Sequence, residues 1–346
     1  MNDLMRNLII SSICGLIASI TFGQYSTKKY IKRNKKAQTI TYGDSTMYAR
    51  GLYYESNRLF VGNSDGSIYY LNLFNNKQQL IFKMPHIDEI RDIEKSGEHL
   101  IAMHSGTNGK IILIELSGSM HVITLPFWQG VFLDGLDFLG KRGFMMGDPV
   151  DGKFSLFHSN DSGNTWERCL GVITASEGEA GFAASGTNVQ ILNDSTYVFV
   201  SGGEKSHFFK SSDNGKNWHS TPLPYFPGES TGAYSMCFSS DSNGVIVGGD
   251  YRDSDLGKNT CFYTTDGGES WMNAMHTVRG YRSCVYFVNG VYYASGRNGI
   301  DFSINNGRDW TAFANGPYFS MTSTDDKLVA TTKHGSIRLF NLIELE

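Results

Sequence analysis

Short apolar segments, each followed by a polar or glycine-containing turn, recur along most of the chain. One well-defined unit places three of them at Leu133–Leu139, Gly143–Met146 and Lys153–His158, and Trp166 opens a fourth. Segments of this length between turn residues are typical of β-strands rather than helices. The unit therefore predicts four antiparallel strands joined by short turns.

The same order of strands and turns occurs seven times. The third strand of each unit is predicted to begin near Ile68, Ile111, Phe154, Phe208, Phe262, Phe302 and Arg338, at intervals of 36 to 54 residues. Blades of four-stranded propellers repeat every ~40–50 residues. The pattern therefore predicts an all-β, seven-bladed β-propeller of four-stranded antiparallel blades, which occupies residues 38–346 as a single domain.

The seventh unit lacks an outer strand of its own, because the sequence ends at Glu346 after the third strand of that unit. The segment Gln38–Tyr42 can supply the missing strand. Pairing the two ends of the chain in one blade would close the ring and remove an open sheet edge. We therefore expect an N-terminal strand to complete the seventh blade.

Four units share the motif S/T-x-D/N-x-G-x-x-W between their third and fourth strands. The hydroxyl and the Asp or Asn side chain can hydrogen-bond to the backbone of the turn, and the glycine can adopt a positive φ. The tryptophan is expected to pack against a neighbouring blade. We assign a structural role to the key residues of the motif, which are Asp161, Gly163, Trp166, Asp213, Gly215, Trp218, Asp266, Gly268, Trp271, Asn305, Gly307 and Trp310.

With this motif the chain resembles the Asp-box, or bacterial neuraminidase repeat (BNR), propellers. It is most similar to photosystem II assembly and stability factors and to their secreted relatives in non-photosynthetic bacteria. The segments Phe182–Asn188 and Val247–Tyr251 also resemble that secreted group. The resemblance implies that the motif is structural and lies on the opposite rim from most ligand sites. It also implies a protein or peptide partner.

The first 23 residues differ in composition from the rest of the chain. Their mostly apolar stretch, Leu8–Phe22, is 15 residues long, which is shorter than the ~20 residues of a membrane-spanning helix. We interpret residues 1–23 as a signal peptide, residues 24–37 as a basic linker, and the protein as exported to the periplasm or the cell exterior. The alternative is an uncleaved membrane anchor at residues 8–22, which the basic residues after the stretch favour.

Charge and motifs narrow the class of ligand. Lys and Arg number 30 against 34 Asp and Glu, for a net charge of −4, which argues against nucleic acid as a partner. The sequence contains no HExxH, no dinucleotide-binding GxGxxG and no calcium-binding loop, so we expect no cofactor and no metal. The cysteines Cys169, Cys237, Cys261 and Cys284 form no CxxC pair and are expected to be buried thiols, although spacing leaves disulfides open. We expect a monomer.

Three arginines and one aspartate stand at the start of predicted first strands. Arg50, Arg91, Asp134 and Arg282 align with one another in four different blades. At these positions they would point toward the mouth of a central funnel, where guanidinium groups suit a carboxylate or phosphate ligand. The alternative is that the arginines form salt bridges between blades, with neighbouring aspartates such as Asp92 as partners.

Three long loops are expected at the same face of the propeller. They span residues 171–187, 222–231 and 249–258, and they carry the further candidate ligand contacts Glu229, Asp250 and Arg252. Long loops in compact domains are commonly functional. The alternative is a solvated loop surface that binds nothing.

Three functions agree with these observations. The preferred one is a non-catalytic propeller that binds a protein, a peptide or an anionic ligand at its funnel. The second is a sialidase-like glycoside hydrolase, although the Arg-Ile-Pro motif of sialidases is missing and six blades would be expected. The third is a glycan-binding or hydrolytic propeller with a carboxylate pair such as Asp134 and Glu229, which would need to lie ~5–10 Å apart for hydrolysis.

Overall fold

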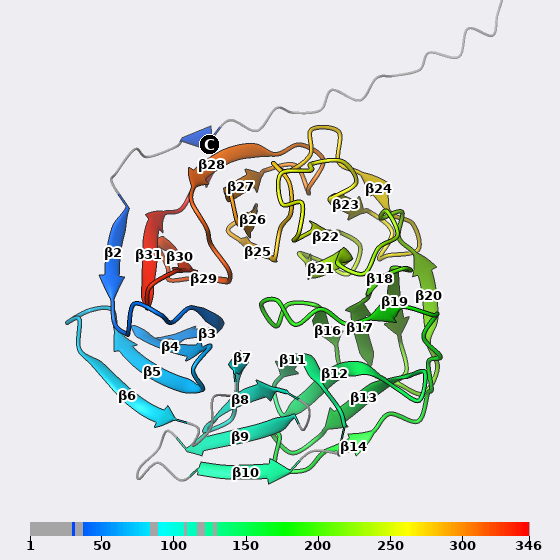
Figure 1. Ribbon diagram of the computed structural model, residues 1–346, viewed down its shortest axis with the longest axis horizontal. Helices are drawn as coiled ribbons and strands as arrows, with labels where there is room; N and C mark the ends of the chain where they lie inside the picture. Colours follow the sequence, from blue (N-terminus) through cyan, green and yellow to red (C-terminus); the bar gives the residue numbers. More distant parts are fainter. Residues whose placement is uncertain are drawn as a thin grey trace, which may run out of the picture.

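A computed structural model of the chain describes residues 30–31, 37–83, 89–106, 109–115, 122–126 and 130–345. Seven β-sheets stand around a central axis, and the strands of each sheet run in order from the axis to the rim (Figure 1). All strand pairs within the sheets are antiparallel. The seven-bladed, all-β propeller that the sequence predicts is confirmed.

The blades follow the order of the chain, and each begins with the strand nearest the axis. Blade one comprises β3 (Ala49–Glu55), β4 (Arg58–Asn63), β5 (Ser67–Asn72) and β6 (Gln78–Lys83). Blade two comprises β7 (Glu89–Ser96), β8 (His99–Ser105), β9 (Lys110–Glu115) and β10 (Val122–Pro126). Blade three comprises β11 (Leu133–Leu139), β12 (Arg142–Val150), β13 (Lys153–Ser159) and β14 (Glu167–Arg168). Blade four comprises β16 (Val189–Asn193), β17 (Thr196–Val200), β19 (His207–Ser211) and β20 (His219–Pro222).

Blade five is a larger sheet, and blade seven uses both ends of the chain. Blade five comprises β21 (Thr231–Phe238), β22 (Gly244–Asp250), β23 (Cys261–Thr264) and β24 (Met272–Asn273), extended by β15 (Glu179–Ala180) and β18 (Gly202–Gly203). Blade six comprises β25 (Cys284–Val288), β26 (Val291–Gly296), β27 (Gly299–Ser303) and β28 (Thr311–Asn315). Blade seven comprises β29 (Met321–Ser323), β30 (Lys327–Thr332), β31 (Ser336–Asn341) and β2 (Gln38–Thr41).

The ring closes through the N-terminal strand, as expected. β2 pairs antiparallel with β31, with Thr39 opposite Arg338. The Tyr42 hydroxyl then donates to Oδ1 of Asn63 in blade one at 2.8 Å. The seventh blade is thus completed by residues from both ends of the described chain, with β2 as its outer strand.

Seven hydrophobic clusters of the core lie between adjacent blades, one at each junction, and a smaller eighth cluster around Ala184 and Tyr234 lies next to the axis. Phe144 of blade three, for example, stacks on Tyr197 of blade four with ring centroids 4.8 Å apart. The cluster that joins blades seven and one contains Val329 and Leu59, both fully buried. Because each blade buries one face against each neighbour, stability depends on a complete ring.

The four repeated motifs form the turns between third and fourth strands. In the second copy, the Ser211 hydroxyl accepts the Gly215 N–H at 2.9 Å, and Asp213 accepts the Asn217 N–H at 2.9 Å. Gly215 has a φ of 76°, which favours glycine. Trp218 packs between its own blade and Phe144 of the preceding blade, with centroids 5.7 Å apart. The predicted structural role agrees with this geometry.

The predicted signal peptide and most of the predicted basic linker lie outside the described residues. Within the linker, β1 (Tyr30–Ile31) is described and pairs with β32 (Glu344–Leu345). No helix in the described ranges is long and apolar enough to cross a membrane. The cysteines at 169, 237, 261 and 284 are free, and all except Cys237 are buried.

Candidate functional site

A loop fills the axis of the ring. The segment between β15 and β16, residues 181–187, reaches the centre of the ring (Figure 1), and we call it the central loop. Arg50 of β3 donates to the Ala184 carbonyl at 2.8 Å, and Arg91 of β7 donates to the Ala183 carbonyl at 2.6 Å. Side chains from blades one and two therefore hold a loop that comes from between blades three and four.

The central loop is also anchored to blades five and six. The Ser185 hydroxyl donates to the Ser283 carbonyl at 2.8 Å, and the Thr187 carbonyl accepts a backbone N–H of β21 at 2.8 Å. Gly186 has a φ of 76°, and a Cβ atom there would lie 2.1 Å from Cγ of Asp92. Because only glycine combines this φ with so close a contact, the loop depends on Gly186.

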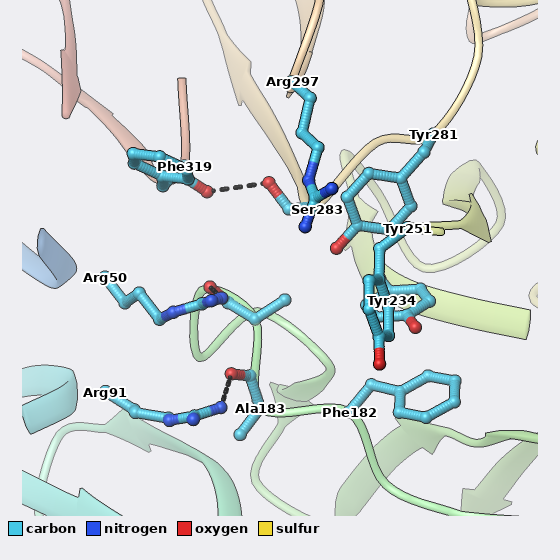
Figure 2. A pocket seen from close by; sticks show the side chains of 11 residues that line it. Arg50, Arg91, Phe182, Ala183, Tyr234, Tyr251, Tyr281, Ser283, Arg297 and Phe319 are labelled. Carbon is cyan, nitrogen blue, oxygen red and sulfur yellow. Dashed lines mark hydrogen bonds between the residues drawn. The ribbon is translucent and has the colours of Figure 1, made fainter. Parts of the chain in front are cut away.

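A cavity of about 300 Å³, which we call the cup, lies where the first strands begin (Figure 2). The backbone of Ala183 and Ala184 forms its floor. Arg50 and Arg91 lie along one side of the cup, and three tyrosines lie along the other. The residues that line the cup are Arg50, Arg91, Phe182, Ala183, Ala184, Tyr234, Tyr251, Tyr281, Ser283, Arg297 and Phe319.

Positive charge exceeds negative charge at the cup. The Glu89 carboxylate bridges two of the arginines, at 2.9 Å from Nε of Arg50 and 2.8 Å from a terminal nitrogen of Arg91. Arg297 lies over the ring of Tyr251 at 5.6 Å, and no described carboxylate lies within 4.0 Å of it. Among the described residues, two of the three guanidinium groups therefore share one carboxylate, and the third has none.

The other wall of the cup is aromatic. Phe182 stacks on Tyr234 with ring centroids 4.2 Å apart, and Tyr281 meets Tyr234 edge-on at 4.8 Å. The Tyr234 hydroxyl donates to the Ser230 carbonyl at 2.7 Å. Burial raises the pKa of Tyr281, and the nearby arginines of the cup oppose this rise. Burial also raises the pKa of Tyr234, so Tyr234 and Tyr281 remain neutral near pH 7 and offer an apolar surface with a polar edge.

A β-bulge sets the position of the side chains at the start of the first strands. Regular pairing is interrupted at Arg50 in β3, Arg91 in β7, Asp134 in β11 and Tyr234 in β21. A bulge inserts an extra residue and changes the direction of its side chain. The predicted equivalence of Arg50, Arg91 and Asp134 is therefore confirmed, and Tyr234 occupies the same position in blade five.

The predicted position of Arg282 is wrong by one residue. Counted from the hairpin turn, Cys284 in blade six corresponds to Gly51 in blade one. The residue before it, Ser283, is therefore the counterpart of Arg50, and Ser283 lines the cup. Since neighbouring residues of a strand point to opposite faces, a shift of one residue moves a side chain from the funnel to the interior of the blade.

Arg282 accordingly lies inside blade six, where its side chain is 0% exposed. It forms an ion pair with Asp301 and donates to Oδ1 of Asn298 at 2.7 Å. This is the bracing role that the sequence left open for the arginines, with a partner in the same blade. Arg282 does not line the cup.

Asp134 has the predicted strand position but lies beneath the central loop, with 1% of its surface exposed. A Cβ atom on Gly181 would lie 2.4 Å from Oδ2 of Asp134. Burial raises the pKa of Asp134 well above its ordinary value; the charge of Asp148 adds to the rise, and Arg91 opposes it. Asp134 therefore lies next to the floor of the cup without lining it.

The loop candidates form a separate cluster at the surface. Arg252 pairs with Glu229 at 2.8 Å, and their side chains are 54% and 78% exposed. Asp250 accepts the Ser230 hydroxyl at 2.7 Å and the backbone N–H of Arg252 at 2.8 Å. None of the three lines the cup. Asp134 and Glu229 consequently do not meet at the cup.

Sequence reasoning missed Glu89, Tyr281 and Arg297 at the cup. Tyr281 directly precedes the misplaced Arg282, and Arg297 lies in the turn between β26 and β27, so correct register in blade six would have pointed to both. The central loop was identified only as part of a long loop and through its resemblance to secreted propellers. Its place at the axis had no local signal, because Arg50 and Ala184 are 134 residues apart.

Comparisons with known proteins agree with the fold. A family model described as sortilin, neurotensin receptor 3 (Sortilin-Vps10) matches residues 154–290. No curated protein matches the sequence.

Solved structures with a similar fold are distant in sequence. A structure of YCF48 bound to D1 peptide has a TM-score of 0.63 and 11% identity over 91% of this chain and 100% of that chain. The WD40 β-propeller domain of Doa1 has a TM-score of 0.63 and 9% identity over 91% of this chain and 97% of that chain. The computationally designed Ika8 protein has a TM-score of 0.57 and 10% identity over 88% of this chain and 100% of that chain. At these identities the similarity establishes a shared propeller fold.

Proposed function

We propose that this chain is a non-catalytic propeller that binds an acidic segment of a protein partner in the cup. One observation carries the proposal. Arg50, Arg91 and Arg297 line the cup. Among the described residues, Glu89 is the one carboxylate that forms an ion pair with any of these arginines. The whole chain has a net charge of −4. The positive charge of the cup is therefore local and opposite in sign to the net charge of the chain.

The shape of the cup favours a peptide over a free inorganic anion. Guanidinium groups bind carboxylates through paired, charge-assisted hydrogen bonds. The aromatic wall of Phe182, Tyr234 and Tyr281 offers apolar contact beside that charge. A ligand that combines a carboxylate with apolar atoms satisfies both walls, as an acidic residue next to an apolar one does.

The floor of the cup limits how far a ligand can enter. The central loop lies across the axis and is bonded to Arg50, Arg91 and Ser283. A cavity of about 300 Å³ is at the small end of ligand pockets. We infer that one or two side chains of the partner enter the cup while the rest of the partner stays outside.

The comparisons support a peptide partner without identifying one. One similar structure is of YCF48, a photosystem II assembly factor, bound to D1 peptide. The proposal includes membership of the Asp-box (BNR) propellers, on the four motif turns, and export of the protein, on the apolar stretch 8–22. A glycan ligand and the oligomeric state are left to experiment.

The hydrolase alternatives require geometry that the described residues do not supply at the cup. A sialidase-like mechanism would need a tyrosine hydroxyl bonded to a glutamate at the funnel. The Tyr234 hydroxyl donates to a backbone carbonyl instead. Hydrolysis by Asp134 and Glu229 would need both carboxyls at one cavity, and the cup is lined by neither. We therefore favour binding without turnover.

The test uses a labelled Gly/Ser peptide that carries one pair of glutamates, with fluorescence anisotropy as the readout. Arg91→Gln removes a positive charge from the cup, while the glutamine amide can still donate to Ala183. We expect the dissociation constant to rise about tenfold, since a hydrogen bond to a charged group contributes about 1.5–3 kcal/mol.

The matched control is Arg142→Gln. Arg142 is half-buried outside the cup and donates to Oδ1 of Asn214 at 3.0 Å, so its replacement should leave binding unchanged. Equal affinity of wild type and Arg91→Gln, with both proteins folded, would show that the cup does not bind acidic peptides. Equal binding of a peptide with lysines in place of glutamates would lead to the same conclusion.

A further inference from the structure

A second cavity, of about 660 Å³, adjoins the cup at the junction of blades seven and one. We call it the groove. It shares Arg50, Arg297 and Phe319 with the lining of the cup. Since the same side chains border both cavities, a chain that leaves the cup past Arg297 enters the groove.

The far wall of the groove is the turn between β30 and β31, which carries Lys333 and His334. This turn is bonded to the segment that follows the closing strand β2. The Gly335 N–H donates to the Met47 carbonyl at 2.9 Å, and Lys333 forms a β-bridge with Tyr48. The turn is thus fixed by the same seam that closes the ring.

The charge of the groove has one sign. Among its described lining residues are the cations Arg50, Arg297 and Lys333, and none of the lining residues is acidic. Lys333 is exposed, and no described carboxylate lies within 4.0 Å of its ammonium group. Asp44 directly precedes the lining segment that begins at Ser45, but its carboxylate is bonded to Thr46. Oδ1 of Asp44 accepts the backbone N–H of Thr46 at 2.9 Å. An acidic group that entered the groove would meet no fixed negative charge there.

His334 has a positive φ, which is uncommon for residues other than glycine. Its φ is 65°, and every other described non-glycine residue with a positive φ is Ser, Asn or Asp. Turns with this geometry favour Asn or Gly. The ring nitrogen Nδ1 lies 2.7 Å from the Ser45 carbonyl, so Nδ1 must carry the hydrogen of this bond. Nε2 is therefore the ring nitrogen left for a ligand, and it can donate to a carboxylate when the ring is an imidazolium.

We propose that the groove is a second subsite, in which Lys333 and His334 bind a further acidic side chain of the same extended peptide. This inference rests on the proposed function of the cup. The cup takes one acidic position, the chain passes Arg297 and Phe319, and a second acidic position reaches the turn between β30 and β31. The ligand class is accordingly an extended peptide with two separated acidic positions.

The test compares two labelled Gly/Ser peptides of equal length at one fixed, low salt concentration. One carries a single pair of glutamates, and the other carries a second pair at its opposite end. We expect wild type to bind the two-pair peptide about five- to tenfold more tightly. Lys333→Ala should reduce that advantage by about threefold, as expected for one exposed ion pair, and should leave the one-pair peptide unaffected.

His334→Asn supplies a variant that should fold well. Asparagine suits the positive φ, and its amide can donate to the Ser45 carbonyl, so the melting temperature should be maintained or raised. The advantage of the two-pair peptide should nevertheless fall. Lys141→Ala is the charge-matched control, because Lys141 is exposed in the turn between β11 and β12, at the opposite end of its blade.

The outcomes separate the two proposals. If Lys333→Ala and His334→Asn leave the two-pair advantage intact while Arg91→Gln weakens both peptides, the groove is not a subsite and the cup remains a binding site. If Lys141→Ala reduces the advantage as much as Lys333→Ala does, the second pair acts through overall charge and the inference is wrong. If neither peptide binds wild type, the proposed function and the inference both fail.

Discussion

The central loop separates a cavity lined by basic side chains from a cavity lined by acidic side chains. The cup lies on one side, with Arg50 and Arg91 held by Glu89 and by the carbonyls of the loop. Further along the same first strands lies a cavity of about 330 Å³, which we call the lower cavity. Its lining includes the acidic residues Asp92, Glu94 and Asp137. The two regions begin only one residue apart in β7, where Arg91 is followed by Asp92.

The two cavities treat their charges differently. Burial raises the pKa of Asp92 to about 8 and that of Asp137 to about 6, and it raises the pKa of Glu94 well above its ordinary value. Asp92 accepts the N–H of Leu136 at 2.9 Å, and Asp137 accepts the N–H of Ile191 at 2.6 Å.

These two acceptors bond to backbone of the next blade, so Asp92 and Asp137 connect neighbouring blades. The cup keeps its arginines charged and partly exposed, whereas the lower cavity suppresses the charge of its acids. The difference shows that side chains next to the axis keep their charge only where solvent can reach them. The following experiments would break or sharpen this contrast.

The largest effect is expected for Arg282→Ala. This change leaves the buried carboxylate of Asp301 next to Arg279 alone, and removal of one partner of a buried ion pair costs about 3–5 kcal/mol. Urea denaturation should show this loss, whereas binding of the one-pair peptide should be unchanged. Arg297→Ala should have the reverse pattern, with stability within about 0.5 kcal/mol of wild type and weaker binding. Loss of binding in a folded Arg282→Ala protein would contradict the assignment of Arg282.

Gly186→Ala should have the next largest effect, a loss of about 2–4 kcal/mol, because it adds a close contact with Asp92 to backbone strain. The control is Gly152→Ala. Gly152 has a φ of 72°, and an added Cβ there would meet no atom within 4 Å. That variant isolates the strain and should lose only about 1 kcal/mol. Equal losses in the two variants would mean that the central loop is not tightly held against Asp92.

The acids of the lower cavity should make stability fall as pH rises. A carboxyl with a raised pKa binds its proton more tightly in the folded chain than in the unfolded chain, so its contribution is full at low pH. The contribution is lost as the pH rises toward the folded pKa, which is about 8 for Asp92. We expect a loss of about 2–4 kcal/mol between about pH 5 and pH 8.

Asp92→Asn should reduce this slope whatever its effect on stability at a single pH. The free energy of unfolding from urea titrations at several pH values gives the measurement. A stability that rises over this pH range would show that Asp92 is ionised in the folded chain.

A smaller loss of stability than for Arg282→Ala, Gly186→Ala or the pH change is expected for Glu89→Gln. The amide can still accept from one arginine, so the free energy of unfolding should fall by less than about 1 kcal/mol. The cup would lose its one carboxylate, and the one-pair peptide should bind about threefold more tightly because repulsion is removed. Unchanged or weaker binding would indicate that Glu89 positions the arginines for the ligand rather than limiting their charge.

Most of the fold could be predicted because its signals are local and repeated. Third strands begin within three residues of the predicted starts; β27, for example, begins at Gly299 against a predicted Phe302. The motif turns repeat the same spacing, and the turn chemistry needs only residues within the motif. Closure by residues 38–42 followed from counting strands rather than from a contact visible in the sequence.

The candidate site was predictable only in part. Arg50 and Arg91 could be aligned with each other, whereas blade six offers two adjacent polar residues, Arg282 and Ser283. A sequence pattern with period two cannot choose between neighbours when both are polar. The central loop and Arg297 reach the cup through contacts between distant blades, and no local pattern encodes them.

Closure of the ring also has a consequence for how the chain reaches its native state. The Arg338 side chain bonds to the Thr39 hydroxyl across 299 residues, so the closing strand β2 has no partner until almost all of the chain has been synthesised. Contacts so distant in sequence form slowly, because the entropy of a very long loop must be lost first. During that interval β2 and the interior faces of the first and last blades stay unpaired. We expect refolding to end in one slow step, and a circularly permuted chain that joins β2 directly to β31 should shorten it.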